Sequence, residues 1–139
     1  MKRDEFIEKC CKTIAQAISF AEKARREGLL ALEDVLEDIE TDENRGILKY
    51  GLRLVVDGTE KEFIDKVLTN IIEHEKDDYA RRLKIIKKEA VLMILEGMNT
   101  RLIAIMLLSY LDDETVSLVE KYILGDSSDK KDDDLDLDA

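Results

Sequence analysis

The sequence has no proline and no tryptophan, although ordinary usage would give a chain of this length about seven prolines. Proline is common in irregular loops and breaks a helix from within. Its absence, together with 45% apolar and 40% charged residues, favours an all-α fold with short connections. We expect one domain over residues 1–125, built as a compact helical bundle of about five helices, two of them long.

Long apolar runs are also missing. The longest spans residues 102–108, far short of the roughly 20 residues that a membrane-spanning helix needs. At the N-terminus, Asp4 and Glu5 follow directly after Met1, Lys2 and Arg3, so the apolar core of a signal peptide is not formed. We therefore expect a soluble cytoplasmic protein.

Residues that carry catalysis or bind metals are scarce. Cys10 and Cys11 are adjacent, with no second pair, which excludes a disulfide framework or a zinc site and predicts core thiols. His74 is the single histidine and lies in a polar segment far from both cysteines, so no nucleophile and base are paired. The aspartates near the C-terminus lack the Gly and Glu positions of a calcium loop. We expect no enzyme activity, no cofactor and no metal.

The net charge of −11 is unevenly distributed. Residues 126–139 hold seven aspartates and two lysines, a local net charge of −5, which leaves −6 for the rest. With little apolar surface to bury, this acidic tail is expected to be disordered. Nucleic-acid binding requires a surplus of Lys and Arg, so the acidic balance argues against it.

The spacing of apolar residues predicts one long amphipathic helix over residues 4–40, followed by a polar break at 41–46. A shorter helix should run from about 44 to 56, and Gly58 should end it in a left-handed conformation. Thr59, with Glu62 three residues later, predicts a capping box at the start of the next helix.

Helical spacing then continues from residue 60 to 96, with Phe63 in the apolar stripe. Residues 73–78 are all polar, so we expect this helix to be solvated on all sides there or to bend. A short apolar helix over 101–111 should be capped by Asn99, and a last one to about residue 124 by Asp112 or Asp113, with Gly125 as its stop.

A basic cluster at Arg81, Arg82, Lys84, Lys87 and Lys88 marks the second half of the chain. Arg81, Lys84 and Lys88 share one face of the predicted helix, and apolar residues occupy another. This face is either solvated, a dock for the acidic tail, or a contact site for an acidic protein or an anionic membrane surface. No aromatic residues interleave with it, which argues against single-stranded nucleic acid.

Two segments are more specific. Residues 24–33 (ARREGLLALE) and 51–58 (GLRLVVDG) resemble the paired signature of the large cytoplasmic loop of the flagellar stator subunit in the MotA/TolQ/ExbB proton-channel family. Residues 89–101 (EAVLMILEGMNTR) are similar to that family's C-terminal cytoplasmic segment, which usually has proline where this chain has Thr100. The resemblance covers roughly residues 20–111.

The resemblance implies a part in the flagellar motor. In the family, the charged helix of this loop faces the rotor protein FliG and exchanges ion pairs with it. By motif position, the family's Arg and Glu fall on Arg25 and Glu33, and Glu22 and Arg26 are expected to join them in partner binding. On one continuous helix Arg25 and Glu33 would lie about 80° apart, on one polar face. Exposed ion pairs of about 0–1 kcal/mol suit a transient contact.

The family's four membrane helices have no counterpart here, so we expect no ion conduction. The resemblance predicts a motor-associated interaction protein at the flagellar basal body, close to the membrane without spanning it, that binds FliG, the stator or a motor scaffold. The alternative is a general helical scaffold or homodimerisation module without a flagellar role, because the apolar run 102–108 is a surface that a second copy could bury.

Overall fold

The computed structural model describes residues 1–41 and 43–126. Within these residues the secondary structure is entirely helical, which confirms the all-α class. The elements are α1 (Arg3–Glu27), the 3-10 helix η1 (Leu29–Asp38), α2 (Ile47–Val56), α3 (Lys61–Ile72), α4 (Asp78–Leu95), α5 (Thr100–Leu108) and α6 (Asp113–Asp126). Apart from Asp126, which ends α6, the expected disordered tail lies outside the described residues.

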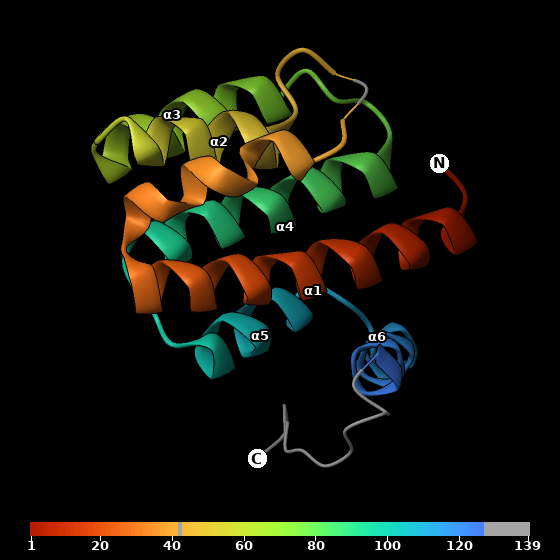
Figure 1. The fold of residues 1–139 in the computed structure, drawn as a ribbon. Helices are drawn as coiled ribbons and strands as arrows, with labels where there is room; N and C mark the ends of the chain where they lie inside the picture. The colour runs from red at the N-terminus through yellow and green to blue at the C-terminus, as the bar shows by residue number, and fades with distance from the viewer. Residues whose placement is uncertain (42, 127–139) are drawn as a thin grey trace.

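Helices α1 and α4 lie side by side in the middle of the bundle (Figure 1). On one side, η1, α2 and α3 cover them. On the other side, α5 and α6 pack beneath α1. Helix α4 contacts α1, α2, α3 and α5, and α1 contacts α4, η1, α5 and α6, so these two helices link the covering layers.

The buried side chains form one apolar cluster to which every helix from α1 to α6, and η1, contributes. Helix α4 buries an almost unbroken run near its end, from Ala90 to Ile94, because other helices pack on several of its sides. Cys10 and Cys11 are buried in this cluster as thiols that form no disulfide, as predicted. Burial raises the pKa of Cys10 to about 12.

The single helix expected over residues 4–40 is wrong. Helix α1 ends at Glu27, and the chain turns at Gly28, whose φ of 96° is a region that residues with a Cβ rarely adopt. The chain then folds back as η1, which packs on α1 and α2. The apolar spacing continued across the turn because Leu32 and Leu36 of η1 are buried in the same core. Periodicity alone does not distinguish one long helix from two segments that share a core.

The continuous helix expected over residues 60–96 is also wrong. Helix α3 ends at Ile72 and α4 begins at Asp78, so the polar middle is a complete interruption. Asp77 explains the restart, because its carboxylate accepts a hydrogen bond from the backbone N–H of Ala80 at 2.8 Å. His74 lies exposed in the turn between the two helices.

Two of the predicted helix caps are confirmed and the predicted capping box is not. Asn99 accepts from the N–H of Leu102, and Asp112 accepts from the N–H of Thr115, as predicted. The capping box at Thr59 is wrong: its N–H bonds back to the carbonyl of Leu54 and closes α2 together with Gly58. Glu60 precedes α3 without a side-chain cap.

Gly125 does not stop the last helix, because α6 continues to Asp126. Its backbone shows no positive φ, in contrast to Gly28, Gly58 and Gly97. Glycine marks a helix end only where the chain enters the left-handed region.

Candidate functional site

The residues singled out by the sequence signature lie at one end of the bundle, where three turns meet. These are the connections from α1 to η1, from α2 to α3, and from α4 to α5 (Figure 1, left). Each contains one glycine with positive φ, at Gly28, Gly58 and Gly97. We call this the glycine end. Sharp turns keep its loops short, so charged side chains at the helix termini are held close to the turns.

Arg25 fastens two of these turns together. Its guanidinium donates a short hydrogen bond to the backbone carbonyl of Gly97, which joins the end of α1 to the end of α4. Beside it, Lys61 at the start of α3 lies 2.9 Å from the carboxylate of Glu96. The hydrogen bond to Glu96 raises the pKa of Lys61. Both contacts therefore connect segments that are far apart in the sequence.

The other three predicted partner-binding residues are exposed. Glu22 and Arg26 lie in the last turns of α1, and Glu33 lies in η1. Arg26 has a side chain 66% exposed, with only a 3.9 Å approach to its neighbour Glu27. The turn at Gly28 invalidates the 80° helical relation between Arg25 and Glu33, because the two residues belong to different helices. Their role in binding stays a prediction.

Two large apolar side chains stand out at the same end. Leu30, at the start of η1, is 72% exposed, and Phe63, at the start of α3, is 59% exposed. Exposed apolar anchors within a charged rim are typical of protein-binding surfaces. Sequence reasoning missed both and placed Phe63 in the apolar stripe, because helical spacing cannot show that this face of α3 is left uncovered.

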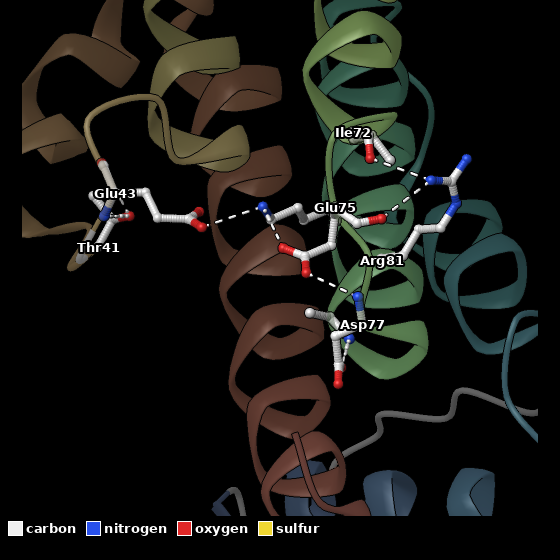
Figure 2. Close-up of polar contacts among 8 residues, drawn as sticks. Thr41, Glu43, Ile72, Glu75, Asp77 and Arg81 are labelled. Atoms are coloured by element: carbon white, nitrogen blue, oxygen red, sulfur yellow. Dashed lines mark hydrogen bonds and ion pairs between the residues drawn. The ribbon is translucent and has the colours of Figure 1, made fainter.

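The basic cluster is used within the fold, at the opposite end of the bundle. Lys84 lies 3.2 Å from Glu43 and 2.9 Å from Glu75, so one cation joins the η1–α2 connection to the α3–α4 connection. Arg81 donates to the backbone carbonyls of Ile72, at the end of α3, and of Glu75 in the connection (Figure 2). These contacts explain how a stretch of polar residues forms an ordered turn.

The contacts of this network shift the pKa values of its charged groups. The hydrogen bond from Lys84 holds the pKa of Glu75 below its ordinary value. Burial opposes the charge of Lys84, but its hydrogen bonds to Glu75 and Glu43 outweigh that effect and raise its pKa. At the edge of the network, the amino group of Met1 lies 2.8 Å from Asp77 and lowers the pKa of that carboxyl.

Lys88 ties α4 to α3. Its amine lies 2.9 Å from both the carboxylate of Asp65 and the hydroxyl of Thr69. The hydrogen bond from Lys88 lowers the pKa of the Asp65 carboxyl. The three residues of the shared basic face, Arg81, Lys84 and Lys88, therefore have partners inside the fold, and an external contact there remains a prediction.

Two further findings concern the described residues. None of their helices has both the length and the apolar character required to cross a bilayer. Nor do their His, Cys, Asp and Glu side chains form a group of three that could hold a metal ion.

Known proteins similar to this chain share one name, Motility protein A. The chain is 34% identical to that of Treponema phagedenis over 91 residues, which are 66% of this chain and 33% of that protein. For Borreliella burgdorferi the identity is 36% over 99 residues, 70% of this chain and 36% of the relative. For Bacillus subtilis it is 45% over 58 residues, 42% of this chain and 20% of the relative.

The chain thus spans about a third of the length of the first two relatives. No protein-family model matches it, and no solved structure shows significant similarity. The similarity rests on sequence and agrees with the resemblance carried by residues 24–33 and 51–58. Over the matched residues, this chain is a MotA-like protein.

Proposed function

We propose that this chain is a flagellar-motor-associated interaction protein that binds a motor component through the glycine end. The partner is the rotor protein FliG, the stator, or a motor scaffold. Binding, without catalysis or ion conduction, is the proposed activity, and the proposed location is the cytoplasm at the flagellar basal body. Its MotA-like sequence supports the motor context.

The observation that carries the binding surface is the position of Arg26, Leu30 and Glu33. All three are exposed, flank the turn at Gly28, and lie within the signature segment 24–33. Leu30 supplies an apolar anchor that loses contact with water on binding. The charges beside it supply orientation and rapid exchange, since exposed ion pairs are individually weak.

Arg25 has a separate role in this proposal. Because its guanidinium already bonds to the carbonyl of Gly97, it positions the turn rather than offering a free charge. A test of the binding surface should therefore change Arg26 and Leu30 and leave Arg25 intact. Substitutions at these two exposed sites are expected to shift the free energy of unfolding by no more than about 0.5 kcal/mol.

The experiment is a pull-down of purified FliG and of stator complexes with the wild-type chain, Arg26→Glu and Leu30→Asp. Lys76→Glu is the matched control, because Lys76 is an exposed charge in the α3–α4 connection at the other end of the bundle. We expect both glycine-end variants to lose binding and the control to retain it. Absence of binding to any motor component, with normal motility after deletion of the gene, would refute the proposal.

A second candidate function, homodimerisation without a flagellar role, is favoured by α5. Leu102, Ile105 and Met106 are 45%, 48% and 41% exposed and follow helical i, i+3, i+4 spacing. They form an apolar stripe that an antiparallel second copy of α5 could bury. Light scattering over a concentration series decides: a concentration-dependent dimer that Ile105→Asp abolishes supports it, and a strict monomer excludes it.

A further inference from the structure

A cleft in the surface gathers lysines from three helices. It has a volume of about 580 Å³ and is lined by residues of α1, η1, the η1–α2 connection, α2, α4 and α6. Lys9 and Lys12 come from α1, Lys49 from α2 and Lys87 from α4. We call it the lysine cleft. Pockets of this volume typically bind small molecules, whereas protein partners bind flatter surfaces.

Among the described residues, the lysines of this cleft have fewer partners than Lys84 and Lys88 of the basic cluster. Ion pairs among the described residues satisfy Lys84 and Lys88, whereas the side chains of Lys12, Lys49 and Lys87 form no ion pair or hydrogen bond there. Lys9 has only a 3.5 Å approach to Glu5. Three lysines without an ion pair among the described residues, gathered in one cleft, are unusual in a chain whose net charge is −11.

Lys87 carries the argument furthest because it is half-buried as well as unpaired. Burial lowers its pKa, and the nearby amine of Lys9 lowers it further. A desolvated amine gains most from an anion that enters the cleft, since the anion replaces the lost hydration. Gln16 also lines the cleft and carries an amide that can donate a hydrogen bond.

We propose that the lysine cleft binds a small anion carrying several phosphate groups. The cleft draws four ammonium groups from three helices, so a ligand with charges spread over linked phosphates matches them better than a single carboxylate or phosphate. Lysine suits this task as a compact point charge with three rotatable donors. Asp38 and Glu40 also line the cleft, and their charge opposes the anion.

The test is calorimetric titration of the full chain at low salt with inorganic phosphate, pyrophosphate and tripolyphosphate. We expect saturable binding that tightens along this series. Lys87→Met should weaken tripolyphosphate binding by at least about tenfold, since a lost charge-assisted hydrogen bond has this effect. Lys49→Met should weaken it as well, and Glu40→Gln should strengthen it.

Lys66→Met is the matched control, because Lys66 is an exposed lysine of α3 outside the cleft. It should leave binding unchanged. Thermal melts should show Lys87→Met to be at least as stable as the wild type, because the substitution removes a desolvated charge and keeps an apolar stem. Loss of binding in that variant then reports on the cleft and not on unfolding.

Three results would overturn the proposal. One is the absence of saturable tripolyphosphate binding, and another is an equal loss of affinity in Lys66→Met and Lys87→Met. The third is binding to phosphatidylglycerol vesicles without binding to tripolyphosphate, which would identify a membrane-facing surface instead of a small-molecule site.

Discussion

Gly51 provides the sharpest test of the packing. It lies in the middle of α2, where α2 crosses α4, and it is buried. A Cβ placed on it would lie 2.9 Å from Cγ2 of Val91 and 3.1 Å from Cδ1 of Leu68. Both neighbours are fully buried, and Val91 is stiff at χ1 because it is β-branched. Neither can move aside cheaply.

The magnitude of Gly51→Ala follows from two opposing effects. Alanine favours a helix interior over glycine by about 1 kcal/mol. Forcing one methyl group into a close-packed core costs about 1–3 kcal/mol. We therefore expect a net destabilisation of about 1 kcal/mol, or a melting temperature lower by about 4 °C.

Urea denaturation followed by circular dichroism measures this change. Gly125→Ala is the control, because a Cβ at Gly125 in α6 would meet nothing within 4 Å. At Gly125 only the preference of alanine for a helix acts, and this preference is weaker at a helix end. The free energy of unfolding of the variant should therefore rise by up to about 0.5 kcal/mol. The reasoning is refuted if Gly51→Ala is as stable as Gly125→Ala or more stable than the wild type.

The double variant Gly51→Ala with Val91→Ala separates the clash from other causes. Removing the two methyl groups of Val91 leaves a cavity that the new methyl at position 51 partly fills. The two substitutions should therefore be less destabilising together than the sum of the single effects, by more than about 0.5 kcal/mol. Additive effects would show that Val91 is not what excludes a side chain at position 51.

Three further predictions concern the polar and thiol groups. Lys84→Met removes the cation that joins two connections, so hydrogen exchange should accelerate in residues 39–46 and 73–77 and leave the centre of α1 unchanged. Because the hydrogen bond from Lys88 holds the pKa of Asp65 below 3.8, the folded state is stabilised above that pH and loses the contribution as pH falls through the lowered pKa. Asp65→Asn should thus flatten the acid limb of a plot of urea midpoint against pH, whereas an unchanged slope would contradict the contact. Finally, iodoacetamide at pH 8 should label Cys10 and Cys11 only on unfolding, and rapid labelling of the native chain would show that the core is open.

The sequence predicted which residues are buried better than where helices end. Ile14, Leu52 and Ile86 lie in the core as their spacing indicated. The boundaries at Gly28 and at residues 73–77 were misjudged, because a turn that returns the chain to the same core leaves the apolar period intact. Asn99 and Asp112 were recognisable because a cap is a local contact between a side chain and the third residue after it.

The candidate site depended on information that the local sequence does not contain. The partner of Arg25 is the carbonyl of Gly97, which is 72 residues away, so its structural role could not be inferred from α1 alone. The exposure of Leu30 and Phe63 depends on which neighbouring helices fail to cover them. Similarly, the lysine cleft draws on three helices whose arrangement had to be known first.

The residues of the MotA-like signature fall into two groups with different physical roles. Gly28 is needed for a left-handed turn, Gly51 for the close approach of α2 to α4, and Arg25 for the bond to Gly97. Gly28 and Arg25 shape the glycine end and Gly51 sets the packing of α2 on α4, so a chain could retain all three simply to fold. Arg26 and Leu30 have no comparable structural contact, since Arg26 only approaches its neighbour Glu27 and Leu30 is 72% exposed. Binding that survives at altered Arg26 and Leu30 would therefore make the signature a mark of fold, whereas binding lost there at unchanged stability would make it a mark of partnership.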